Sequence, residues 1–227
     1  MAASLSATHR VESHHEDEAC AGGERLERPA GIGITLTALP GQTIVVEGDP
    51  IEGWFRIAGG AVRLSKSTPD GRRQVIDFLI AGESFGISSE EHYGYSVEAI
   101  ARTTLVRHSR ARLEAAIEAQ PELARRLFRI ACADLQRARQ HLLLLGRKSA
   151  DEKLASFLLG LAARLGTRDV VQLPMSRQDM ADYLGLTIET VSRTLTRLRH
   201  RGLIALRTPQ HVVLLRTDRL RGLAEGS

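Results

Sequence analysis

Residues 32–106 alternate between short β-branched, apolar runs and turn residues. The runs include TIVVEG, GWFRIAGGAVRLSKS, RQVIDFLIAG and YSVEAIARTTLVRHS, and they are separated by Gly41, Gly48-Asp49-Pro50, Gly59-Gly60, Pro69-Asp70-Gly71 and Gly82. Many short strands bounded by such turns are typical of a small β-sandwich or jelly roll. We therefore expect a β-roll domain over residues 31–115.

After Ser109 the pattern changes to alanine, leucine, arginine and glutamate at helical spacing. Apolar residues follow one another in alternating steps of four and three, as in a coiled-coil seam, at Ala124, Phe128, Ala131, Leu135, Ala138, Leu142 and Leu145. The seam predicts a long helix over residues 116–147. Spacing alone allows an ordinary helix packed on its own sheet or a helix paired with a second copy, and the second makes the seam a homodimer interface.

The last third of the chain carries start and stop signals for helices. One helix is expected near residues 151–165. Ser176 with Asp179 three residues later resembles a capping box, so a second helix begins there. Gly185 interrupts it, and Thr187 can cap a third helix that continues to about His200.

The segment that follows, LIALRTPQHVVLL, contains two β runs around a Thr-Pro-Gln turn and predicts a hairpin. Helix, short turn, helix and hairpin together form a winged helix-turn-helix. The expected fold class is α+β: a flexible tail over residues 1–30, the β-roll over 31–115, a dimerisation helix over 116–147 and the winged helix-turn-helix over 148–227.

Charge is distributed unevenly along the 227 residues, which suffice for two domains with apolar cores. Residues 1–30 hold three arginines against six acidic residues, a net −3, and lack the apolar surface to fold alone. Residues 188–221 hold eight arginines against Glu189 and Asp218, a net +6. Such a local field attracts polyanions.

Several classes of protein are disfavoured. No apolar run approaches the ~18 residues of a membrane span, and the first twenty residues lack the core of a signal peptide. Cys20 and Cys132 form no disulfide framework. An enzyme of the cupin kind would need clustered histidine and carboxylate ligands, and no H-x-H occurs between Ile32 and Val106. We expect a cytoplasmic protein without membrane contact that is not an enzyme.

The most specific chemistry lies at the start of the third helix. Glu189, Ser192 and Arg193 fall at i, i+3 and i+4, so their side chains share one face near the helix N-terminus, the end of a recognition helix that meets base edges. Arg193 can donate to guanine O6 and N7, Glu189 can accept from cytosine N4, and Ser192 can adapt to either. The alternative is a Glu-Arg surface pair worth only a few tenths of a kcal/mol.

Further DNA contacts are expected around this trio, at phosphates or bases. They are assigned to Ser176, Arg177, Ile188, Thr190, Arg197 and Arg201. The alternative for the arginines is an ordinary solvated face.

The segment SRQDMADYLGLTIETVSRTLTRLRHRGLI resembles the DNA-binding domain of the Crp/Fnr transcription regulators, and its trio matches the E-x-x-S-R of Fnr-type members. Upstream, LPGQTIVVEGDPIEGWFRIAGGAVRLSK and IAGESFG resemble the cyclic-nucleotide-type β-roll of that family. The resemblance covers roughly residues 31–217 and is nearest to the FixK-type branch of alphaproteobacteria. One departure is Thr194, where the family usually has an aliphatic residue.

This resemblance implies a homodimer that binds double-stranded DNA at a palindromic operator similar to TTGAT-N4-ATCAA. It also implies RNA polymerase as a partner and activation of genes for micro-oxic respiration, denitrification or nitrogen fixation. The DNA-reading face does not fix the sign of regulation, so a repressor stays an alternative.

The β-roll lacks the residues with which the family holds a cyclic phosphate. Ile87 follows Phe85-Gly86 where those proteins have a glutamate, and Tyr93-Gly94 stands where an arginine-serine pair is expected. A buried phosphate without a charged partner is strongly disfavoured. We therefore expect activity without a small-molecule effector and without a cofactor.

Two gated alternatives remain beside this expectation, a cyclic-nucleotide-gated and a haem-gated regulator of the same family. Haem needs an axial ligand, which His92, His108 or His141 can supply in principle. Two cysteines cannot hold a four-cysteine iron-sulfur cluster. We expect no bound metal ion.

Overall fold

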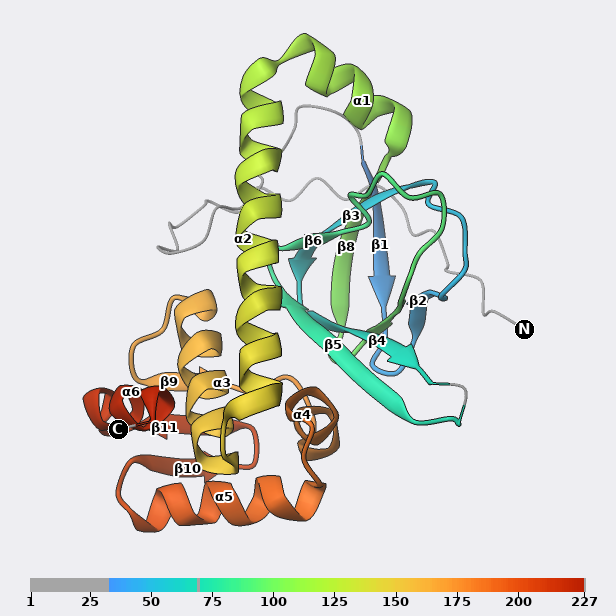
Figure 1. The fold of residues 1–227 in the computed structure, drawn as a ribbon. Helices are drawn as coiled ribbons and strands as arrows, with labels where there is room; N and C mark the ends of the chain where they lie inside the picture. Colours follow the sequence, from blue (N-terminus) through green and yellow to red (C-terminus); the bar gives the residue numbers. More distant parts are fainter. Residues whose placement is uncertain (1–32, 69, 227) are drawn as a thin grey trace. The chain divides into compact units, whose positions relative to one another are not determined.

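The computed structural model describes residues 33–68 and 70–226 (Figure 1). These residues form two compact units, one ending at Cys132 and the other beginning at Ala133, and each unit is described by itself. The expected tail, residues 1–30, lies outside the described residues. Among the described helices, none is long and apolar enough to cross a membrane.

The N-terminal unit contains two antiparallel sheets. The first has the strand order β1-β8-β3-β6, with β1 at Ile34–Ala38, β3 at Gly53–Gly59, β6 at Ser84–Phe85 and β8 at Thr103–Ser109. The second has the order β2-β7-β4-β5, with β2 at Thr43–Val45, β4 at Ala61–Ser67, β5 at Arg73–Ile80 and β7 at Ser96–Ala99. Strands far apart in sequence are neighbours in both sheets, and the predicted β-roll is confirmed.

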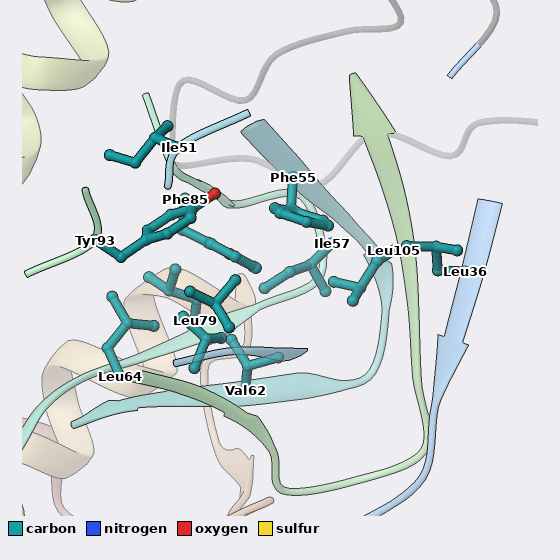
Figure 2. Packing of buried hydrophobic residues seen from close by; sticks show 12 residues of the cluster. Leu36, Ile51, Phe55, Ile57, Val62, Leu64, Leu79, Phe85, Tyr93 and Leu105 are labelled. Atoms are coloured by element: carbon teal, nitrogen blue, oxygen red, sulfur yellow. The ribbon is translucent and has the colours of Figure 1, made fainter. Parts of the chain in front are cut away.

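Apolar side chains from both sheets meet in one core (Figure 2). Ile57 and Leu105 come from the first sheet, whereas Val62 and Leu79 come from the second. Because side chains alternate along a strand, Phe55 and Ile57 of β3 face this core, whereas Trp54 and Arg56 lie on the other face.

The helix expected over residues 116–147 is divided in two. Helix α1 spans Arg110–Ala119, and helix α2 spans Pro121–Arg147. Proline has no backbone N–H to continue α1, but it fits the first position of a new helix. The residue before a proline also avoids helical geometry, and Gln120 is extended, with φ −136°.

The predicted seam lies along α2 with its large side chains open to solvent. Phe128 and Leu142 are each 70% exposed and Leu135 is 51% exposed, and Ala131 and Ala138 are exposed as well. Only the two ends of the seam, at residues 124 and 145, are partly covered. The single chain therefore leaves most of this apolar stripe without a packing partner among the described residues.

The C-terminal unit has the predicted order of helices and hairpin, with two additions. Its elements are α3 (Ala150–Leu165), β9 (Val170–Gln172), α4 (Arg177–Leu184), α5 (Ile188–His200), β10 (Ile204–Thr208), β11 (His211–Leu214) and α6 (Thr217–Glu225). The hairpin is the wing, and β9 adds a third strand in the order β10-β11-β9. Neither β9 nor α6 was expected from the sequence.

Helices α4 and α5 begin and end at the capping and turn residues that the sequence predicts. Asp179 N donates to Ser176 Oγ at 3.1 Å and Ser176 N donates to Asp179 Oδ2 at 3.1 Å, which completes the capping box. Gly185 ends α4 in the left-handed conformation at φ 61°, which favours glycine. Thr187 Oγ1 then accepts from Thr190 N at 3.2 Å and starts α5. The turn between the helices is thus short and defined.

Candidate nucleic-acid interface

Helix α5 has one buried and one exposed face. Val191, Leu195 and Leu198 are buried in the C-terminal unit. The three residues predicted to read bases, Glu189, Ser192 and Arg193, are all exposed, and together with Ile188 they line an open hollow on the protein surface. The structure therefore brings the predicted trio together on the solvent side, at the N-terminal end of the helix.

The two charged members of the trio stay separate. The pKa of Glu189 is lowered by a hydrogen bond from its own backbone N–H, by one from Thr187 and by the nearby charge of Arg193. No ion pair joins Glu189 and Arg193 within the described part of the chain, which disfavours the surface-pair alternative. Glu189 is therefore a carboxylate at neutral pH, and the Arg193 guanidinium keeps its donors available for an external acceptor.

At the start of α4, the two residues expected to contact DNA have different surroundings. Ser176 is exposed, but its hydroxyl already bonds Asp179 Oδ2 at 2.7 Å. Arg177 is partly buried and donates from Nη2 to the carbonyl of Pro209, in the turn of the wing, at 3.2 Å. Burial lowers the pKa of Arg177. Arg177 thus links α4 to the wing by a hydrogen bond, a structural role that its position in the sequence did not indicate.

The two arginines expected to contact phosphates at the other end of α5 are both close to Asp151 of α3. Arg197 Nε lies 2.9 Å from Asp151 Oδ1, and Arg201 Nη1 lies 3.5 Å from Asp151 Oδ2. Sequence reasoning missed Asp151, because 46 residues separate it from Arg197 and no local spacing links them. Thr190, the remaining predicted contact, is half-buried beside the cap of α5.

Side chains from α2 and α3 hold the turn that precedes α5. The His141 ring stacks on Tyr183 with centroids 4.0 Å apart, and His141 Nε2 lies 2.8 Å from the Tyr183 carbonyl oxygen. Lys153 Nζ donates to the carbonyl of Leu184 at 3.0 Å. The last carbonyls of a helix lack partners within it and favour positive charge nearby. These contacts therefore fix the end of α4 and, with it, the starting point of α5.

In the β-roll, Tyr93 occupies the place where the family resemblance puts the phosphate-binding pair. It is buried in the core beside Phe85 and Ile51 (Figure 2), and its hydroxyl donates to the Gly53 carbonyl at 2.9 Å. Burial raises the pKa of Tyr93 to about 12, so the phenol stays neutral. A Cβ on Gly86 would lie 3.0 Å from the Tyr93 oxygen and 2.9 Å from the Gly53 oxygen, so little space is left around the ring.

The histidines considered as haem ligands lie in separate surroundings. His108 stacks on Trp54 with centroids 4.3 Å apart, and burial lowers the pKa of His108. His92 forms a backbone bridge with Pro50, and His141 belongs to the contact with α4 described above.

Comparison with known proteins identifies both halves of the chain. The family model described as a Crp-like helix-turn-helix domain matches residues 152–223, and that of a cyclic nucleotide-binding domain matches residues 36–120. The nitrogen fixation regulation protein FixK of Bradyrhizobium diazoefficiens is 46% identical over 170 residues, which cover 73% of this chain and 72% of the relative. Its namesake from Rhizobium meliloti is 41% identical, covering 86% of this chain and 89% of the relative.

Among solved structures, FixK2 from Bradyrhizobium japonicum matches with a TM-score of 0.81 and 38% identity, covering 85% of this chain and 97% of that chain. A Crp-family regulator from Thermus thermophilus matches with a TM-score of 0.68 and 26% identity, covering 84% of this chain and 96% of that chain. These relatives are similar to the chain over both of its units.

Proposed function

Because the chain belongs to the Crp/Fnr family of transcription regulators, we propose that it is a FixK-type activator that binds a TTGAT-N4-ATCAA-like palindrome as a homodimer without a small-molecule effector. The observation that carries this proposal is the trio at the start of α5, whose three side chains are exposed beside one another. Relatives named as nitrogen fixation regulators support target genes for nitrogen fixation, and the family resemblance adds micro-oxic respiration and denitrification to the proposed targets.

Base recognition would follow from the chemistry of the trio. The Arg193 guanidinium can donate two hydrogen bonds, to guanine O6 and N7. The Glu189 carboxylate can accept one from the amino group of cytosine. A carboxylate close to phosphates is unfavourable unless it bonds a donor, so Glu189 would also reject bases that present only acceptors at its position. Ser192, between the two, would add an adaptable hydrogen bond.

The homodimer would form along α2. Burial of an exposed apolar stripe on two parallel helices is the usual reason for a coiled-coil seam, and a two-fold axis through it would place two copies of α5 on the two half-sites of a palindrome. RNA polymerase is the partner expected of an activator bound beside a promoter.

Independence from an effector is supported by the β-roll core. Tyr93 supplies a neutral phenol where a cyclic phosphate would need a cation, and its hydroxyl is already used by Gly53. A cyclic nucleotide would therefore have to displace a packed aromatic ring and would still lack a charged partner.

The experiment is operator binding by the purified, ligand-free full chain. We expect preferential binding to a TTGAT palindrome over a scrambled duplex of the same composition, at a stoichiometry of one dimer per site, and no change on addition of cAMP. Equal affinity for both duplexes would refute sequence-specific recognition. Stoichiometric cAMP binding in a calorimeter, together with tighter operator binding, would instead support the gated alternative.

A further inference from the structure

Asp151, in the first turn of α3, lies against the C-terminal half of the DNA-reading helix. Its two oxygens are 2.9 and 3.0 Å from Arg197 Nε, Oδ1 also accepts from Arg197 Nη2, and Oδ2 is 3.5 Å from Arg201 Nη1. The Asp151 side chain is only 18% exposed, whereas about half of each arginine side chain faces solvent, 51% and 49%. The Asp151 carboxylate thus contacts both guanidinium groups from beneath the surface, while the arginines stay open to solvent on their other side.

Thr194 gives Arg197 a second anchor. Its side chain is fully buried, and its Oγ1 accepts from Arg197 Nη2 at 3.1 Å. A buried hydroxyl needs a hydrogen-bond partner, and here the partner is the same arginine that Asp151 holds. The unusual threonine at this position is therefore part of one network with Asp151 and Arg197.

We propose that Asp151 is an affinity-setting residue that competes with DNA phosphates for Arg197 and Arg201. The edge of a guanidinium formed by Nε and one Nη is the edge with which arginine grips carboxylate or phosphate through two parallel bonds, and on Arg197 Asp151 already occupies it. This inference rests on the proposed function, since it requires α5 to lie on DNA.

The competition has a defined electrostatic consequence. A phosphate that contacts either arginine must replace or share the oxygens of Asp151 and must approach a fixed negative charge. Since phosphate contacts release counterions, this carboxylate lowers both the affinity for DNA and its dependence on salt. Half of the Arg197 side chain faces solvent, so the barrier that the ion pair sets is modest and can be overcome by DNA. A residue that merely oriented Arg197 toward phosphate would have the opposite effect.

The test is Asp151→Asn, which keeps the shape of the side chain and removes its charge. Affinities for a TTGAT palindrome and for a random duplex are measured between about 50 and 200 mM salt. We expect both duplexes to bind about 3- to 10-fold more tightly at the lower salt, and the plot of log affinity against log salt to steepen by about 0.9 for each arginine released to a phosphate. Asp151→Ser, which also removes the charge, should behave in the same way.

The matched control is Asp218→Asn in α6. It changes the net charge by the same amount, but Asp218 pairs with Arg221 of its own helix, at 3.2 Å, and its side chain is 98% exposed. Thermal melting confirms that each variant is folded. Unchanged or weaker DNA binding by both Asp151 variants, or equal tightening by Asp218→Asn, would overturn the proposal. Failure of the wild-type protein to distinguish the palindrome from random DNA would instead refute the proposed function, whatever the variants do.

Discussion

Leu142 and Leu143 offer a matched pair for testing the homodimer. Both are exposed leucines on α2, at 70% and 65%, but only Leu142 belongs to the seam. Adjacent helical positions point about 100° apart, so a partner helix that covers one leaves the other at the edge of the contact. Leu142→Ala should therefore weaken the dimer, and Leu143→Ala should have little effect.

The magnitude follows from the exposed surface. Leucine to alanine removes three carbon groups, each worth about 0.8 kcal/mol when buried, and 70% of the residue is still exposed in the single chain. Each protomer then loses about 1.7 kcal/mol and the dimer about 3.4 kcal/mol, which raises the dimer dissociation constant about 300-fold. Alanine is a good helix former, so α2 itself should persist.

Sedimentation equilibrium across a concentration series measures this constant for the wild type and both variants, and circular dichroism checks their helix content. Similar dissociation constants for Leu142→Ala and the wild type would show that the seam is not the interface. A larger effect of Leu143→Ala than of Leu142→Ala would place the contact on another face of α2.

Two predictions concern stability. Tyr93→Phe leaves the buried Gly53 carbonyl without its donor and should lower the free energy of unfolding by about 1–3 kcal/mol in urea, with cAMP still unbound; an unchanged midpoint would show that this hydrogen bond contributes nothing. Ser176→Ala removes the cap of α4 and should cost about 1 kcal/mol, with Ser176→Gly costing less; equal losses for the two variants would argue against a capping role.

Local signals in the sequence predicted the C-terminal unit closely. The capping pair Ser176 and Asp179, the left-handed Gly185 and the cap Thr187 each act over three or four residues, so their spacing is visible in the chain. Val191, Leu195 and Leu198 follow one another in steps of four and three and form the buried side of α5. The fold of this unit and the exposed side of α5 could therefore be predicted without knowledge of distant contacts.

Other features depend on contacts between residues far apart in sequence. Asp151 meets Arg197 across 46 residues, and Lys153 meets the Leu184 carbonyl across 31. The periodicity of a helix cannot show which distant group its charges approach. Strand β9 has only three residues and is held by pairing with β11, which explains why its short run gave no clear signal.

The division before α2 shows a different kind of error. A single helix over residues 116–147 agrees with the heptad spacing, but Pro121 interrupts the hydrogen bonding that such a helix would need. The position of this proline is visible in the sequence, but the heptad spacing alone does not show the break.

The measurement that tests the central claim most directly is a competition assay with Arg193→Ala against cognate, single-base-altered and random duplexes. If Arg193 donates to a guanine, the variant should lose about 1–3 kcal/mol on the cognate site and little on random DNA. Arg201→Ala, as a loss of a phosphate contact that Asp151 already weakens, should lower the affinity for all duplexes alike and reduce the salt dependence by no more than about 0.9. An equal loss of affinity by Arg193→Ala for every duplex would show that Arg193 contacts phosphate, and the exposed trio of α5 would not be the surface that reads the operator.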